Sequence, residues 1–170
     1  PDWGMGYPEV EIDDVSFASA ADALFAEGFG LSFLWDKSVQ IDEFLGEVLK
    51  HIDGSLFVDR STGKFTLRLA RGGYDVGSLI TLDEDSIERI DDFKREALGE
   101  LSNSVTVVFW DAVTGKDNAV TVQDISLIAA QGATIGVTIQ YPGITTGELA
   151  SRVASRDLRA SSAGGPTSRR

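Results

Sequence analysis

Several residue types that carry chemistry are scarce. Cysteine is absent from the 170 residues, and histidine and methionine occur once each. Without cysteine there is no disulfide, no thiolate nucleophile and no cysteine-based metal site. No run of eighteen apolar residues occurs and no charged-then-apolar leader opens the sequence, so neither a membrane span nor a secretory leader is expected in this stretch. Enzyme classes that depend on cysteine are excluded.

Basic residues are also scarce in the first part of the chain. Residues 1–100 carry 22 acidic and nine basic side chains, whereas residues 101–170 carry five acidic and six basic ones. Because nucleic-acid affinity depends on neutralising phosphates with Lys and Arg, an acidic body argues against a nucleic-acid partner. The C-terminal arginines are interpreted as a solvated helix face and tail, with a DNA contact as the alternative: Arg152, Arg156, Arg159, Arg169 and Arg170.

The polar residues do not form a recognisable catalytic or metal-binding motif. His51, the lone histidine, is interpreted as a charge at a helix C-terminus rather than as a base. The acidic clusters around Asp13, Asp42, Asp83 and Asp91 lack the alternating ligand spacing of a calcium loop. The glycine-rich stretches are turns without a phosphate-loop or nucleophile-elbow pattern. We therefore expect no catalytic residue, no metal and no cofactor.

The N-terminal half predicts a short irregular lead-in over residues 1–14, a helix from Ser16 and a longer helix that begins near Ser38. In the first helix Phe17, Leu24 and Phe25 fall at helical spacing, with Gly28 as the stop. Asp53 and Gly54 end the second helix, because both tolerate a left-handed backbone. A hairpin with Gly63 in its turn then follows, and five residues are available for its inner face: Leu56, Val58, Phe65, Leu67 and Leu69.

The C-terminal half predicts further strands. Residues 86–93 fit either a helical turn or a strand, and we favour a strand. Residues 104–111 are apolar on both sides, as in a strand buried on both faces, and VTVQD returns as their antiparallel partner. A short helix over 126–131, a strand ATIGVTIQY and a last helix follow. That helix has a capping-box pattern at Thr145 and Glu148 and an apolar stripe: Leu149, Ala150, Val153, Ala154 and Leu158.

Together these elements predict an α+β fold, with an antiparallel or mixed sheet of hairpins packed against two or three helices. We expect a single domain over residues 15–160, followed by a flexible tail over 161–170. The start at Pro-Asp-Trp suggests a fragment of a longer protein.

The order of several segments resembles the siphophage tail-tip family of phage tail proteins, over roughly residues 1–162. These are central hub or host-specificity proteins, similar to lambda host-specificity protein J and the large tail protein of gene transfer agents. The Ile-Asp-Gly hinge before the first hairpin and the Asn-x-Val-x-Val strand carry much of the likeness. The segments are PDWGMGYP, SFASAADALFAEGFGLSFLWD, HIDGSLFVDRSTGKFTLRLAR, ELSNSVTVVFWD and YPGITTGELASRVASRDLRA.

The resemblance implies a baseplate-hub-like α+β domain in the tail of a phage or prophage virion, made in the bacterial cytoplasm. Its implied partners are the distal tail protein, the tape-measure protein and two further copies in a trimeric ring. A polysaccharide-degrading or cell-wall-degrading domain is the alternative, and it would need paired carboxylates in a groove. For assembly, the candidate interface residues are aromatics that one sheet cannot all bury: Trp3, Tyr7, Trp110 and Tyr141.

Overall fold

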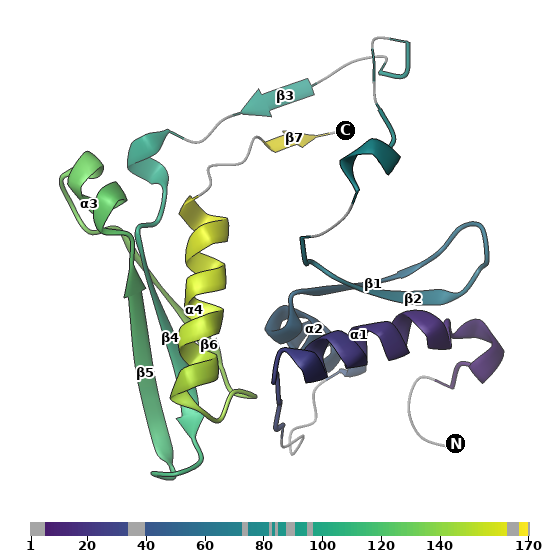
Figure 1. The fold of residues 1–170 in the computed structure, drawn as a ribbon, viewed down its shortest axis with the longest axis horizontal. Helices are drawn as coiled ribbons and strands as arrows, with labels where there is room; N and C mark the ends of the chain where they lie inside the picture. Colours follow the sequence, from purple (N-terminus) through teal and green to yellow (C-terminus); the bar gives the residue numbers. More distant parts are fainter. Residues whose placement is uncertain are drawn as a thin grey trace. The chain divides into compact units, whose positions relative to one another are not determined.

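The chain divides into two compact units, Pro1–Gly72 and Gly73–Arg170. The computed structural model describes residues 6–33, 40–72, 75–81, 83, 85–87, 91–94, 97–162 and 167–169 (Figure 1). Trp3 and Trp35 lie outside the described residues. The sequence predicts one domain over 15–160, and the two predicted hairpins within this range enter separate sheets.

Unit 1 contains two helices. A 3-10 turn, η1 (Glu9–Glu11), precedes α1 (Asp14–Ala26), and α2 spans Ile41–Ile52. The expected stops are confirmed: Gly28 after α1 has φ 62°, and Asp53 at the end of α2 has φ 51°. The left-handed backbone at Asp53 turns the chain directly from α2 into the first strand.

The first hairpin pairs β1 (Gly54–Val58) with β2 (Phe65–Leu69) in an antiparallel ribbon. Gly63 occupies the turn with φ 72°, as its position in the sequence predicts. Leu56, Leu67 and Leu69 are half-buried, but Val58 is half-exposed. The predicted inner face is therefore covered only along part of the ribbon.

Polar contacts tie the helices of unit 1 to this ribbon. The Ser16 hydroxyl on α1 accepts a hydrogen bond from the Leu67 amide at 3.1 Å and donates one to the Asp13 carbonyl at 2.8 Å. The Arg71 guanidinium after β2 holds the Glu27 carboxylate through two bonds of 2.7 and 3.0 Å. Both links join residues more than forty positions apart, so they fix α1 against the ribbon.

Unit 2 is built on a three-stranded mixed sheet in the order β5-β4-β6. Strand β4 (Ser104–Asp111) pairs antiparallel with β5 (Lys116–Gln123) along its whole length and parallel with β6 (Gly136–Tyr141). Gly115 supplies the positive φ of the β4–β5 turn. The predicted strands are present, and β5 begins four residues before the predicted VTVQD.

Helix α4 (Gly147–Ser162) packs against β4 and β5 and forms the core of unit 2 (Figure 1). Its predicted apolar stripe is buried in full. Thr146, rather than Thr145, caps the helix, because its hydroxyl accepts a hydrogen bond from the Leu149 amide. On the sheet, the residues facing this helix are buried as well: Val105, Val107 and Phe109.

Asn103 ties the start of β4 to the segment between α3 (Ile125–Gln131) and β6. Its side chain is fully buried and donates to the Gln131 side-chain oxygen at 2.5 Å and to the Ala133 carbonyl at 2.8 Å. Its own side-chain oxygen accepts from the Ile135 amide at 2.8 Å. One buried amide group therefore makes three hydrogen bonds to the segment between α3 and β6, and its own polar atoms are satisfied.

The segment before β4 and the C-terminus contain short elements. They are η2 (Val76–Ser78), β3 (Asp91–Lys94) and η3 (Leu98–Glu100), and β3 pairs antiparallel with β7 (Thr167–Arg169). Residues 91–93 of the favoured strand over 86–93 are thus in a strand, and 88–90 lie outside the described residues. Within the range predicted as a flexible tail, 161–170, α4 continues through Ser162 and β7 pairs with β3.

The α+β class is confirmed, with helices packed on two separate small sheets. In the described part of the chain, no helix is both long and apolar enough to cross a bilayer.

Replacing the buried amide tests the role of Asn103. Asn103→Ala should lower the free energy of unfolding by about 3 kcal/mol, because it removes the three hydrogen bonds of a fully buried side chain. Urea denaturation followed by circular dichroism measures the change. Asn118→Ala, an exposed asparagine of β5, is the matched control and should stay within about 0.5 kcal/mol of the parent. Equal effects of the two substitutions would contradict the assignment.

Candidate interaction surface

Strand β4 has one covered face and one open face. Val105, Val107 and Phe109 are buried beneath α4, whereas Thr106 and Val108 are half-buried and Trp110 is 48% exposed. The sequence predicts burial on both sides of this strand. That expectation is wrong for the second side, because nothing in the described part of unit 2 packs over it as α4 packs over the first.

The register of the sheet extends the open face across all three strands. Thr121 and Thr138 lie opposite Thr106 on its two sides, so three threonines form a row. The Thr106 and Thr121 hydroxyl oxygens are 2.8 Å apart. The next row consists of Ala119, Val108 and Gln140, and the last row consists of Asp117 and Trp110. The Trp110 ring is the largest side chain on this face.

A shallow hollow lies beside Trp110. Its volume is about 200 Å³. Of its lining residues, Asp117 is directly opposite Trp110 in the strand register, and it is the one carboxylate among them. The lining consists of Val108, Phe109, Trp110, Asp117, Gln140 and Pro142.

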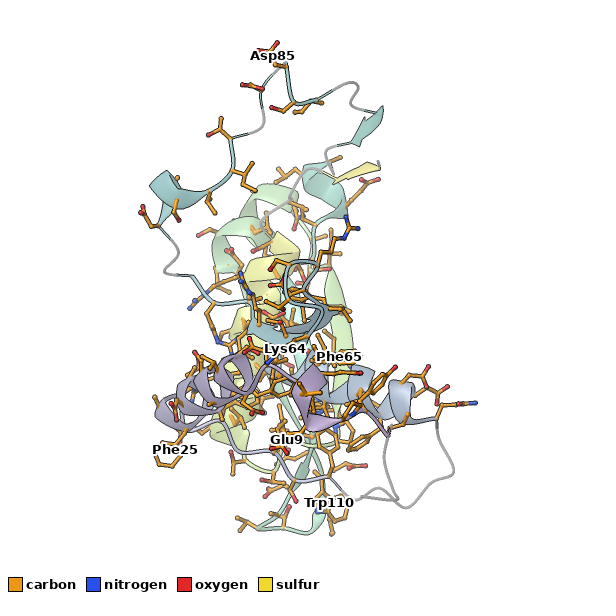
Figure 2. The ribbon with its side chains drawn as sticks, turned by 90° about the vertical axis from the view of Figure 1, so that its right-hand side faces the viewer. Glu9, Phe25, Lys64, Phe65, Asp85 and Trp110 are labelled. Atoms are coloured by element: carbon orange, nitrogen blue, oxygen red, sulfur yellow. The ribbon has the colours of Figure 1, made fainter. Side chains whose placement is uncertain are left out.

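Tyr7, the second described candidate, lies in unit 1. Its ring meets the Phe65 ring edge-on, with 4.7 Å between the ring centroids, and it remains half-exposed. The ring therefore covers the end of strand β2 (Figure 2 labels Phe65) while leaving part of its surface open.

Tyr141 does not belong to the open surface. Its side chain is only 3% exposed, since the residue ends β6 on the face beneath α4. Its hydroxyl donates to the Asp157 carboxylate at 2.6 Å and accepts from the Arg156 guanidinium at 3.1 Å. The expectation that the sheet leaves this ring uncovered is wrong, because strand alternation points it inward.

His51 lies in the last turn of α2, as the sequence predicts, but its side chain is fully buried. Its Nδ1 lies 2.7 Å from the Glu47 carbonyl oxygen, to which it donates. The imidazole meets the Phe33 ring edge-on, with 4.7 Å between centroids. The histidine is thus a packing residue of unit 1. The sequence around His51 does not predict this packing, because its ring partner Phe33 lies in the segment before α2.

Exposed aspartates serve as turn caps. Hydrogen bonds from Ser61 lower the pKa of Asp59, and those from Ser86 lower the pKa of Asp83. The amide of Val113 lowers the pKa of Asp111 in the β4–β5 turn. Among the residues that the structure describes, no three His, Cys, Asp or Glu side chains are grouped to hold a metal ion.

The apolar outer side of α1 is the feature that the sequence analysis missed. Phe25 is 88% exposed, although its spacing with Phe17 and Leu24 predicts a packed position. The signal was available, because apolar residues occur all round this helix instead of along one stripe.

The Tyr141 cluster predicts a loss of stability at alkaline pH. Burial, followed by the hydrogen bond to Asp157, raises the pKa of the Tyr141 phenol above its ordinary value. The resulting stability is present below the unfolded pKa of about 10 and is lost as the pH rises through the folded one.

Urea denaturation between pH 8 and pH 11 measures this loss. Tyr141→Phe should lower stability by about 1 kcal/mol at pH 8 and reduce the alkaline decline. Tyr7→Phe, at a half-exposed tyrosine, is the control. A decline of the same size in the Tyr141→Phe protein would refute the link.

Comparison with known proteins places the chain in a family. A family model described as "Putative phage tail protein" matches residues 40–169. A solved structure titled "Virion of native gene transfer agent (GTA) particle" has a similar fold, with a TM-score of 0.50 at 20% identity. The similarity covers 84% of this chain and 34% of the solved one, so the chain spans about a third of that protein.

No curated protein sequence matches. Since the family match covers most of the chain, including the first hairpin and the whole sheet of unit 2, the protein belongs to this family of phage tail proteins.

Proposed function

We propose that this tail protein is a component of the tail-tip hub and that it acts by holding neighbouring proteins together rather than by turning over a substrate. The observation that carries the proposal is the open face of the β5-β4-β6 sheet, which ends at the half-exposed Trp110. Membership in a phage tail family supports a structural role in the virion.

The open face has the properties of a partner surface. Tryptophan is enriched among the residues that dominate binding energy at protein interfaces, above all where surrounding contacts exclude water. Trp110 stands beside Asp117 at the end of rows of small or uncharged side chains, so a partner surface can approach closely. The hollow beside its ring can accept one projecting side chain. In unit 1, the exposed part of the Tyr7 ring is a second contact point.

The partners we propose are the distal tail protein, the tape-measure protein and two further copies of this chain in a trimeric ring in the virion tail. The resemblance to hub proteins supports this set. Trp3, which lies outside the described residues, stays a candidate contact in the same assembly. Apart from Asp117, the named residues of the open face are uncharged, which suits protein contact because charged residues are depleted from interface cores.

A carbohydrate-processing role is the second candidate, since an aromatic ring beside a carboxylate is a common arrangement in sugar-binding sites. Glycoside hydrolysis requires two carboxyl groups across the scissile bond. The hollow beside Trp110 supplies Asp117 as its single acidic lining residue. This candidate therefore has weaker support than assembly.

A nucleic-acid contact through the C-terminal arginines also has weaker support. Arg156 is engaged with Asp157 at 2.8 Å and with the Tyr141 hydroxyl, inside the unit. Arg152 and Arg159 are exposed on α4. Salt-dependent DNA binding, measured at two ionic strengths, would identify such a contact.

Substitution of Trp110 tests the assembly proposal. Trp110→Ala should weaken association with the distal tail protein of the same particle by about tenfold or more, because it removes a large ring from the interface. Isothermal titration calorimetry measures the affinity, and multi-angle light scattering measures the oligomeric state of a longer chain.

Val113→Ala, in the exposed turn after β4, is the matched control and should bind like the parent. A longer chain that stays monomeric at high concentration and binds neither tail neighbour would sink the proposal.

A further inference from the structure

Apolar residues occur on every side of α1, with Asp14, Ser19 and Asp22 among them on the exposed side, yet only one side of the helix is covered. Ala20 is buried, and Ser16 and Phe17 on the same side are half-buried toward the ribbon. A helix with apolar residues all round is normally enclosed by protein on every side. The outer side of α1 therefore lacks the cover that its composition calls for within the described residues.

The outer side forms a continuous surface along more than two turns. Val15 is 78% exposed and Phe25 is 88% exposed, and Figure 2 shows the Phe25 ring projecting away from its helix. At 100° per residue, the exposed positions of the helix fall on one arc. We call this arc the α1 outer face: Asp14, Val15, Ala18, Ser19, Ala21, Asp22, Phe25 and Ala26.

The shape of this face suits another helix. Ala18, Ala21 and Ala26 are small, so a neighbouring backbone can approach to the short end of helix–helix distances, about 8 Å. Phe25 stands near one end of the face and Val15 near the other, with Ala18 and Ala21 between them. Side chains of a second helix can insert between these two larger residues, as ridges fit into grooves.

The charge of the face restricts the partner. Its two charged residues, Asp14 and Asp22, are both acidic, and the helix contains no basic residue. Residues 1–72 as a whole carry 13 acidic and six basic side chains. Two copies meeting through this same face would bring like charges together, which is unfavourable. A complementary helix carries Lys or Arg beside its apolar stripe.

We infer that the α1 outer face binds an amphipathic, basic helix of another tail protein. The inference rests on the proposed function, because it takes assembly with neighbouring proteins as the role of the chain. It adds a surface separate from the open sheet face and states the chemistry of the partner. It also accounts for the exposed ring of Phe25, because binding of a partner would remove the apolar surface of this ring from water.

Two synthetic peptides serve as probes. Each has about 18 residues, or five helical turns, with a leucine stripe; one has lysine on its polar side and the other has glutamate. Fluorescence anisotropy at physiological ionic strength measures their binding to the 170-residue chain. We expect the leucine–lysine peptide to bind and the leucine–glutamate peptide to bind at least about tenfold more weakly.

Variants of the chain separate contact with the face from general attraction to an acidic protein. Val15→Ser combined with Phe25→Ser should weaken the leucine–lysine peptide by about tenfold or more. Ile80→Ser replaces an apolar residue that is as exposed as Phe25 but lies in unit 2, and it should bind like the parent. Because all three positions are exposed, the melting temperature should stay unchanged.

Three outcomes would overturn the inference. The first is equal binding of the two peptides, and the second is unchanged peptide binding by the double variant. The third is a parent chain that dimerises in sedimentation while the double variant stays monomeric, because a second copy would then occupy the face. A chain that associates with a tail neighbour through Trp110 but shows any of these outcomes leaves the proposed function standing. If the chain shows no Trp110-dependent association but still binds the leucine–lysine peptide, the proposed function fails and the binding property of the α1 outer face stands.

Discussion

The packing of β4 against α4 is the contact on which unit 2 depends. Val105, Val107 and Phe109 on the strand meet the buried stripe of the helix, and Val105, Val107 and Val153 are among the most deeply buried side chains of the described residues. Burial of apolar side chains is the main favourable term in folding. Strands β5 and β6 are held in place because they pair with the two edges of this one central strand. Asn103 then fixes where β4 begins, through its bonds to the chain on either side of Ala133.

The same contact has a consequence for function. A single helix covers a single face of a sheet, so the residues that alternate with the buried ones on β4 are left on an open face that ends at Trp110. In unit 1 the ribbon likewise covers one side of α1 and leaves Val15 and Phe25 outside. Within the described residues, each unit therefore leaves one face uncovered: a face of threonines and small or polar residues that ends at Trp110 in unit 2, and the outer side of α1 in unit 1. This is the condition expected of an assembly module whose remaining surfaces are covered by other proteins.

The sequence predicted features that depend on neighbouring residues. Gly28 and Gly63 stand at the positive-φ positions expected of them, and the αL stop at Asp53 is present. The stripe on α4 follows helical periodicity and is buried as predicted. Predictions that depend on which elements meet were less successful. The periodicity of α1 does not say which side faces the ribbon, so Phe25 was placed on the packed side. The sequence of β6 does not say which face of the strand receives a helix, so the Tyr141 ring was expected at the surface.

By itself, the sequence determined the α+β class, the order of the helices and strands, the turns and the absence of cysteine chemistry, because these follow from local backbone preference, periodicity and composition. Only the tertiary structure decided that the chain forms two units, that His51 is buried, that β7 pairs with β3 and that one face of the β4 sheet stays open. These features result from contacts between segments far apart in the chain. Local patterns constrain such contacts weakly, since one apolar stripe can be covered by several different partners.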